Sequence, residues 1–303
     1  ANSIATVIGT RNLAPRTALM MAAGCEFVGA ISGTAVAITI GKGIVIPEFQ
    51  TMGIILSGVA AVIVWAVAAT LKGMPISLHH GLVCGLVGAA LAQGGPSIIN
   101  WAVLERIFGA VVTWPVLGLI GGFCFMLAIL WLCRRWKPAT VRVVFTKLQI
   151  GSAAFLAYSH GKNDGQMPIG LIAMGLMAFR GTTDFHIPFW AVITAAASIS
   201  LGTAVGGRRV IRTIGSQVTT LKPESGFAAE ASAATLIEIA SRMGLPVSTT
   251  HCISSTVMGV GATRRLSAVR WGVVERIVLT WVLTFPGCVM LGWLFGFLSR
   301  ALG

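Results

Sequence analysis

Long apolar runs, separated by short polar or basic segments, dominate this sequence. Several have about the 20 residues that a helix needs to cross a bilayer; they cover residues 17–40, 51–71, 105–133, 188–205 and 271–298. The runs are too continuous for the alternating pattern of a barrel strand. Because the hydrocarbon region gives the backbone no water to bond, such runs must form helices. The pattern therefore predicts an all-α polytopic membrane protein, a helical bundle set in the lipid bilayer.

The amino-acid composition supports this class of protein and limits the kinds of binding partner that we expect. Hydrophobic residues make up 55% of the chain and charged residues only 10%, whereas a soluble domain carries about 25% charged residues. The net charge of +13 fits the Lys and Arg that membrane proteins concentrate in cytoplasmic loops, so we expect no nucleic-acid partner. The six cysteines show no paired spacing, and no CxxC or HExxH motif occurs. We therefore expect no metal site and no cofactor.

Two distant stretches of the chain resemble each other. "MPISLHHGLVCGLVGAALA" begins at Met74, and "LPVSTTHCISSTVMGVGA" begins at Leu245. Farther along, "LERIFGAVVTWPVLG" matches "VERIVLTWVLTFPGC". The matched pairs are Pro75 with Pro246, Ser77 with Ser248, His80 with His251, Glu105 with Glu275 and Arg106 with Arg276. Internal repeats of this kind are typical of secondary transporters.

Loop charge predicts that the two repeats are inverted. The loops beside the first motif, residues 41–50 and 93–104, hold one basic residue, Lys42. The matching loops of the second copy, residues 206–222 and 263–270, hold seven: Arg208, Arg209, Arg212, Lys222, Arg264, Arg265 and Arg270. Since basic loops stay in the cytoplasm, equivalent loops should lie on opposite faces of the membrane. We expect a first inverted repeat over residues 1–147 and a second over residues 148–303.

The same count predicts two re-entrant helical hairpins. Both loops around residues 224–262 are basic, so this hairpin should enter and leave on the cytoplasmic side, with its Gly-Leu-Pro turn inside the membrane. Its counterpart, about residues 51–92, should enter from outside. Lys72 and Arg242 would then lie near the buried tips, where their side chains either snorkel or help to neutralise an anion.

Hydroxyl residues follow the proline of each hairpin turn and begin a new helix. A helix N-terminus presents free N–H groups and the positive end of its dipole, which suits an oxyanion. Ser248, Thr249 and Thr250 of the second hairpin, and Ser77 of the first, are therefore candidate substrate-binding residues. Two inverted copies would aim two such helix ends at one point near the membrane midplane.

A third break is expected at "SHGKNDGQ", residues 159–166, which places Lys, Asn and Asp between two apolar runs. Its glycines predict an unwound helix. A carboxylate is costly at this depth, so we expect Asp164 to couple transport to a proton or another cation; the alternative is that it only ties down the broken helix. Asn163 is a further candidate for binding the substrate.

Other polar residues allow two interpretations each. His80 and His251 are ligands of the substrate or simply packed helix residues. Glu105 and Glu275 are coupling residues or partners of the arginine that follows each of them. Glu26, on an otherwise apolar helix, is expected to bond to a neighbouring segment.

These motifs resemble the inorganic phosphate transporter (Pit) family, and the form "SHGxNDGQ" resembles its bacterial low-affinity branch. The matching stretches are "SHGKNDGQMPIGL", "GGRRVIRTIG", "GLPVSTTHCISSTVMGVG" and the opening "ANSIATVIGTR". The resemblance implies a secondary active symporter that imports inorganic phosphate, driven by protons or sodium. It implies broken helices, inverted repeats and a multi-pass location in the plasma membrane, which for a bacterium is the inner membrane. In the proton-coupled branch, phosphate travels as a neutral complex with a divalent metal.

The chain departs from the family in two places. It opens at "ANSIA", which aligns with the residues after Asp164, so the first GxND motif is missing and we expect the sequence to be incomplete at its start. Asn2 of this opening is a candidate substrate-binding residue. Leu78 stands where the family has a small hydroxyl residue, and it cannot donate a hydrogen bond to an anion.

Other functions are compatible with the sequence. Some relatives move sulfate, so a sulfate permease of the same fold is one alternative. An intramembrane hydrolase is another, since Ser248 and His251 lie one helical turn apart. A channel would show a continuous polar lining, which is not found. The sequence leaves the oligomeric state open, a homodimer included.

The predicted orientation can be tested by cysteine labelling. Single cysteines at Ser216 and Ser267, in a cysteine-free background, should not react with an impermeant thiol reagent in intact cells, because both loops are expected in the cytoplasm. Lysed cells, in which both cysteines should react, provide the control. Labelling of either site from outside would contradict the orientation.

Overall fold

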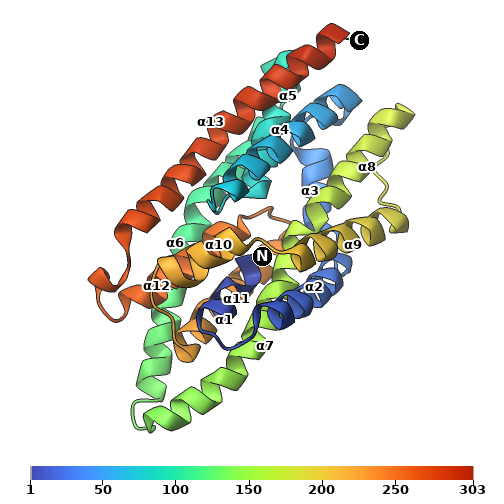
Figure 1. The fold of residues 1–303 in the computed structure, drawn as a ribbon. Coiled ribbons are helices and arrows are strands. Elements are labelled where there is room, and N and C mark those ends of the chain that lie inside the picture. Colours follow the sequence, from blue (N-terminus) through green and yellow to red (C-terminus); the bar gives the residue numbers. More distant parts are fainter. Residues whose placement is uncertain (1, 303) are drawn as a thin grey trace.

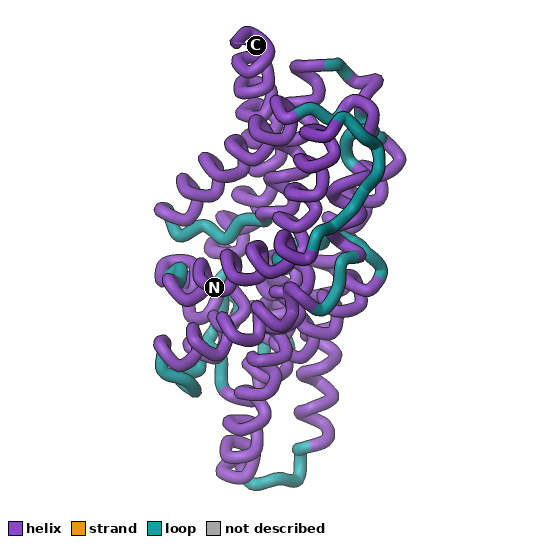
Figure 2. The backbone as a smooth tube through the Cα atoms, turned by 90° about the vertical axis from the view of Figure 1, so that its right-hand side faces the viewer, coloured by secondary structure: helices purple, strands orange, loops and turns teal. Residues whose placement is uncertain are grey.

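The computed structural model describes residues 2–302, and all regular elements in this range are helical (Figures 1 and 2). The first half contains η1 Asn2–Ile4, α1 Ala5–Gly9, α2 Pro15–Ile31, α3 Ala35–Gly43, η2 Pro47–Phe49, α4 Met52–Leu71, α5 Leu78–Gln93, η3 Pro96–Ile98 and α6 Trp101–Leu132. The second contains α7 Pro138–Asp164, α8 Gln166–Arg180, α9 Phe189–Val205, α10 Arg208–Arg212, the π-helical η4 Thr213–Gln217, α11 Pro223–Arg242, α12 Thr249–Ala262, η5 Leu266–Ala268 and α13 Trp271–Leu302. The all-α class is confirmed.

The helices repeat along the chain at a nearly constant spacing. Helix α4 begins at residue 52 and α11 at 223, a spacing of 171; α6 begins at 101 and α13 at 271, a spacing of 170. In Figure 1, α6 descends to the loop that joins it to α7, whereas α13 ascends to the C-terminus. This is the arrangement expected of inverted repeats, although the inversion and the boundary at residues 147–148 stay predictions.

Within residues 2–302, three helices are long and apolar enough to cross a membrane: α4, α6 and α13. Two helix pairs meet the same length and apolarity test only when taken together, and each is bent at a short break: α2 with α3 at 66°, and α9 with the helical segment Arg208–Gln217 at 67°. The prediction of one uninterrupted helix over residues 17–40 is therefore wrong, because the chain bends at residues 32–34. The first N–H groups of α3 are bonded at this bend by Gln166, whose Oε1 accepts from Val36 at 2.8 Å and from Ala37 at 3.3 Å.

Each hairpin is a helix–turn–helix of the same design. Helices α4 and α11 end in turns whose glycines, Gly73 and Gly244, have φ of 70° and 69°. A side chain is disfavoured there. Each turn is followed by a serine that caps the next helix. Ser77 Oγ accepts from the His80 N–H at 3.2 Å, and Ser248 Oγ accepts from the His251 N–H at 3.1 Å. The two predicted hairpins thus form as helical pairs.

Each hairpin packs against the last long helix of the other repeat: α5 against α13 and α12 against α6. Glycines allow the backbones to approach. A Cβ on Gly88 would lie 2.1 Å from Val289 O, and a Cβ on Gly259 would lie 2.1 Å from Leu119 O. Small residues are the usual contact between membrane helices, since only close backbone approach gives dense packing there. Because each hairpin packs against a helix of the other repeat, the two hairpin tips lie at the centre of the molecule.

The contact between α12 and α6 gives a stability prediction. Gly259→Ala should destabilise the fold by about 1–3 kcal/mol, as overpacking a dense interior does, because its methyl group would collide with backbone. Thermal unfolding in detergent, followed by loss of the monodisperse fraction, measures the change. Gly109→Ala on α6, where nothing lies within 4 Å of the added Cβ, is the matched control; an equal melting temperature for both variants would contradict the argument.

Candidate functional site

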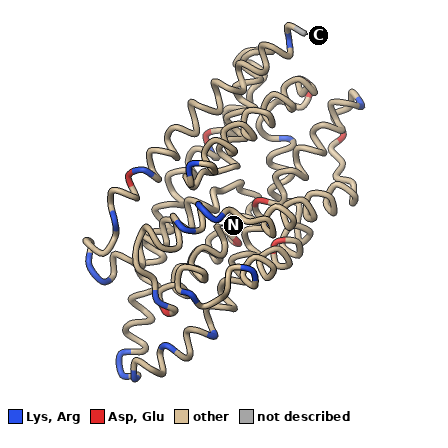
Figure 3. Tube along the Cα trace, viewed as in Figure 1, with Lys and Arg blue, Asp and Glu red and all other residues tan. Residues whose placement is uncertain are grey.

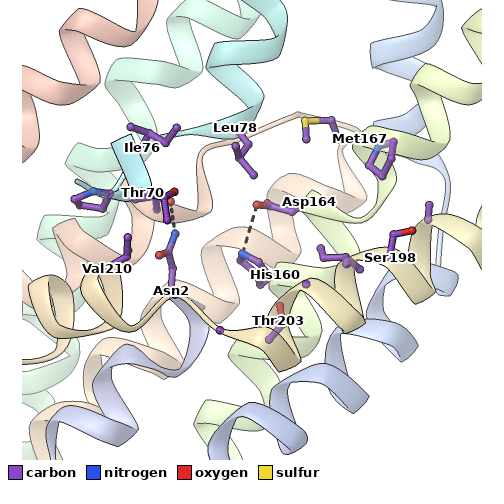
Figure 4. A pocket seen from close by; sticks show the side chains of 18 of the residues that line it. Asn2, Thr70, Ile76, Leu78, His160, Asp164, Met167, Ser198, Thr203 and Val210 are labelled. Carbon is purple, nitrogen blue, oxygen red and sulfur yellow. Dashed lines mark hydrogen bonds and ion pairs between the residues drawn. The ribbon is translucent and has the colours of Figure 1, made fainter. Parts of the chain in front are cut away.

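A cavity of about 500 Å³ lies where the tip of the first hairpin, the end of α7 and the chain around the α9–α10 bend meet (Figure 4). This size suits a small ligand. Its lining residues are Asn2, Thr70, Met74, Pro75, Ile76, Leu78, His160, Asp164, Met167, Pro168, Ala195, Ser198, Ile199, Gly202, Thr203, Gly206, Gly207, Val210 and Thr250.

Asp164 lies at the end of α7 and contacts groups from three elements. Its Oδ2 accepts a hydrogen bond from Thr249 Oγ1 at 3.2 Å and lies 3.4 Å from His160 Nε2. Its Oδ1 lies 3.7 Å from Nδ1 of His79, on α5. The carboxylate therefore joins α7 to both hairpins, and it faces the cavity (Figure 4).

His160 links Asp164 to a second buried carboxylate. Its Nδ1 lies 3.0 Å from Glu26 Oε1 on α2. Glu26 is fully buried and also accepts hydrogen bonds from Ser3, at 2.9 Å, and from Thr203. Glu26 therefore bonds to neighbouring segments, as its apolar helix predicted. The result is a chain of ionisable groups, Glu26–His160–Asp164, leading from α2 to the cavity.

The prediction that residues 159–166 are unwound is wrong. Helix α7 continues through Asp164, and Gly165, the residue between α7 and α8, has φ −67° and ψ −23°. Pro168 accounts for the break in the hydrogen-bond ladder, because proline has no N–H to donate one turn back. The helical geometry places His160 and Asp164 four residues apart on one face. The four-residue spacing of His160 and Asp164 is present in the sequence, but it places both side chains on one face only if the segment is helical.

The end of α7 is also fixed to the tip of the second hairpin. Asn163 Nδ2 donates to Ser241 Oγ at 2.8 Å and to Leu245 O at 3.3 Å. Lys162 Nζ lies 2.6 Å from Glu238 Oε1, which also accepts from Arg242 Nε at 2.8 Å. Asn163 therefore holds the hairpin in this structure, and it is not among the residues that line the cavity.

The hydroxyl residues occupy different positions around the site. Thr250 lines the cavity and accepts from Asn2 Nδ2 at 2.5 Å, so the chain's opening residues meet the second hairpin. Ser77 and Ser248 are buried at their caps. Leu78, the departure from the family pattern, lines the cavity and presents an apolar surface to it.

Other predicted residues lie elsewhere. The structure does not bring Glu105 or Glu275 to the cavity; both are on exposed faces of α6 and α13. His80 and His251 are buried against each other, with ring centroids 4.9 Å apart, and His251 stacks on Trp281. Neither ring lines the cavity. The sequence did not single out His79, His160 or Thr203.

The charges around the cavity are one-sided. Among residues 2–302, the cavity lining includes the carboxylate of Asp164 but no Lys or Arg. An anion would therefore meet neutral donors and a negative group, beside the imidazole of His160, which lies between two carboxylates. Such a site binds an anion well only when a proton or metal cation binds with it. Together, the paired helical hairpins, the bent spans and a central cavity with one carboxylate are features of secondary transporters.

Comparison with known proteins identifies the family. The sequence profile of the phosphate transporter family matches residues 1–292, and the chain belongs to that family. It is a multi-pass membrane transporter, and it is not an enzyme. The hydrolase alternative is thereby excluded; in the structure the oxygen of Ser248 caps a helix, and the ring of His251 stacks on a tryptophan.

Relatives cover nearly the whole chain. A protein of Rhizobium meliloti (strain 1021) named "Probable low-affinity inorganic phosphate transporter" is 42% identical over 294 residues, which is 96% of this chain and 88% of that protein. A protein of the same name from Bacillus subtilis (strain 168) is 37% identical, over 96% and 89%. A solved structure named "The sodium-dependent phosphate transporter" superimposes with a TM-score of 0.89 at 28% identity, covering 100% of this chain and 94% of that one.

The contacts of Asn163 predict a local effect. Asn163→Ala removes the side-chain donor to the Leu245 carbonyl at the hairpin turn, and a buried acceptor left unsatisfied costs about 1–3 kcal/mol. Ser241 loses the same donor but keeps its own bond to the Ile237 carbonyl. Amides at residues 244–250 should then exchange hydrogen faster. Hydrogen–deuterium exchange with mass spectrometry measures this directly. Asn12→Ala is the control, because Asn12 also donates to a backbone carbonyl, that of Thr146 at 2.7 Å, and its side chain bonds to α7 and not to the hairpin turn. Unchanged exchange in both variants would argue against the proposed anchor.

Proposed function

We propose that this protein is a secondary active symporter that imports inorganic phosphate, and that the cavity beside Asp164 is its substrate site. The observation that carries the proposal is the charge of this cavity. A member of a phosphate transporter family has here a site with a carboxylate and, among residues 2–302, no Lys or Arg; its imidazole, His160, lies 3.4 Å from that carboxylate. Phosphate could occupy it at low cost only together with a positive species. Symport is the physical consequence of that requirement.

Neutral donors would hold the anion. Thr250 and Asn2 lie on the cavity wall, and Thr250 is in the first turn of α12, where N–H groups are free of intrahelical bonds. The dipole of this helix adds a positive potential at the same point. Ser77, Ser248 and Thr249 support the two helix starts, and Asn163 fixes the second hairpin. No observation here favours sulfate over phosphate.

Asp164 would carry the coupling ion. A proton on Asp164, or a sodium ion beside it, removes the repulsion between the carboxylate and the phosphate. Each ligand then raises the affinity of the other by the same factor, commonly about 5–150-fold. The chain Glu26–His160–Asp164 supports protons, since an imidazole between two carboxylates can pass a proton. The solved relative, which is named as sodium-dependent, supports sodium.

The membrane location and the cargo complete the proposal. We place the protein in the plasma membrane of a bacterium, the inner membrane where there are two, as its bacterial relatives suggest. It needs no resident cofactor. Its cargo would be phosphate alone or a neutral complex of phosphate with a divalent metal, and a homodimer is compatible with the fold.

Replacing Asp164 tests the proposal. Asp164→Asn keeps the shape and removes the charge, so gradient-driven accumulation of phosphate in proteoliposomes should be lost while some binding remains. The apparent affinity for phosphate should also stop responding to the coupling ion, a response of about 5–150-fold in a typical coupled system. Uptake is measured at pH 6 and pH 8, with and without sodium, which also identifies the ion.

Asp184→Asn is the matched control, because Asp184 is an exposed carboxylate in the loop between α8 and α9. It should accumulate phosphate as the wild type does. Wild-type accumulation by Asp164→Asn under all four conditions would leave Asp164 a structural residue.

A further inference from the structure

A second, smaller pocket of about 100 Å³ lies on the other side of the first hairpin's turn. Met74 and Pro75 line both this pocket and the main cavity, so the turn is the wall between them. This volume exceeds the roughly 10–15 Å³ that one water needs, so the pocket has room for one small ion. Its polar lining comes from Lys72, Thr213, Gln217, Arg276 and Thr280.

The charge of this pocket is opposite to that of the main cavity. Its described lining contains two cations, Lys72 and Arg276, and no carboxylate. Arg276 donates from Nε to Gly272 O at 3.2 Å. This bond uses one edge of the guanidinium and leaves the terminal nitrogens as further donors. A pocket with two cationic donors is suited to an oxyanion.

Part of the polar lining is absent from the symmetry-related place in the molecule. Repeat spacings of 170 and 171 relate the hairpins and long helices, and the shared sequence Thr-Ile-Gly at 39–41 and 213–215 gives 174 for the bent helices. The counterparts are Met243 for Lys72, Ala110 for Thr280 and Gly43 for Gln217. Arg276 and Thr213 keep theirs, Arg106 and Thr39. Shared ancestry of the repeats therefore does not account for the second cation or for the added polar groups.

The pocket lies on the side of the basic loops. Arg270, in the loop before α13, donates from Nη1 to Ser216 O at 3.0 Å and to Gln217 O at 3.3 Å, so this loop holds the η4 segment that forms one wall. Figure 3 shows the basic residues before α13 at the same lower-left end as those of the α6–α7 loop. Their charge predicts that this end is cytoplasmic.

We infer that this pocket is a cytoplasmic docking site for a phosphate-type oxyanion, which receives inorganic phosphate when the turn at Met74–Pro75 moves aside. The inference rests on the proposed function, since that function supplies the anion. Lys72 and Arg276 attract an anion that the carboxylate of the main cavity repels, and this difference favours release toward the cytoplasm. A lipid phosphate headgroup has the same chemistry, so the test must distinguish the two sources.

Phosphate exchange in proteoliposomes of known orientation provides the test. Lys72→Met and Thr280→Ala replace two lining residues by their repeat counterparts. We expect the half-saturating phosphate concentration on the cytoplasmic face to rise about two- to fivefold, the range of an exposed charge interaction. The value on the external face should not change. The effect of Lys72→Met should shrink at high salt, because screening weakens exposed charges.

Arg135→Met is the matched control, since it removes an exposed charge from the α6–α7 loop outside both pockets. Lys72→Arg should behave as the wild type, and Lys72→Gln replaces Lys72→Met if the latter does not fold. The assay is run in phosphatidylcholine with and without phosphatidylglycerol.

Three results would overturn the inference: no change at the cytoplasmic face, an equal change at both faces, or a change that appears only with phosphatidylglycerol, which would assign the pocket to a lipid headgroup. A wild-type protein that exchanges no phosphate would refute the proposed function itself. That outcome is distinct, because the other three require a working transporter.

Discussion

A backbone group at membrane depth must find its hydrogen-bond partner inside the protein, because the hydrocarbon region supplies none. In this chain, side chains from distant segments meet that need where the helices are interrupted. Gln166 bonds the first N–H groups of α3. Asn163 reaches the carbonyl of Leu245 at the second hairpin's turn, and Thr213 donates to the carbonyl of Gly73 at the first, at 2.9 Å. These bonds hold the breaks together, and the breaks surround the cavity.

The glycine contacts explain why the breaks meet at one place. Each hairpin lies against the last long helix of the other repeat, and the same backbone contact occurs at Gly88 and at Gly259. These close contacts set how each hairpin is positioned against its long helix in this structure. The tips are thus held against the end of α7, where Asp164 contacts Thr249 of one hairpin and His79 of the other.

Charge then divides the central region into two environments. The main cavity has carboxylate chemistry, with Asp164 joined through His160 to Glu26. The pocket beyond the Met74–Pro75 turn has two cations. In the proposed function, a carboxylate beside the anion site would make binding depend on a coupling ion, and the cations on the far side of the turn would favour release in one direction. The two hairpins are alike, whereas the residues that differ between them are those from which we infer the direction of release.

Local signals in the amino-acid sequence were enough to predict the helical membrane class and the two helical hairpins. They also singled out the Ser-Thr-Thr and Asn-Asp motifs, which the structure brings together at the end of α7. These signals are apolar length, prolines before hydroxyl residues, and spacing within a repeat. Which polar residues share a site depended on tertiary packing. That packing joined Glu26 and His79 to the end of α7, and it placed Glu105, Glu275, His80 and His251 outside the cavity. The reason is that rotation of a helix about its axis is set by its packing contacts, here the glycine faces, and the position of a residue along the chain does not reveal that rotation.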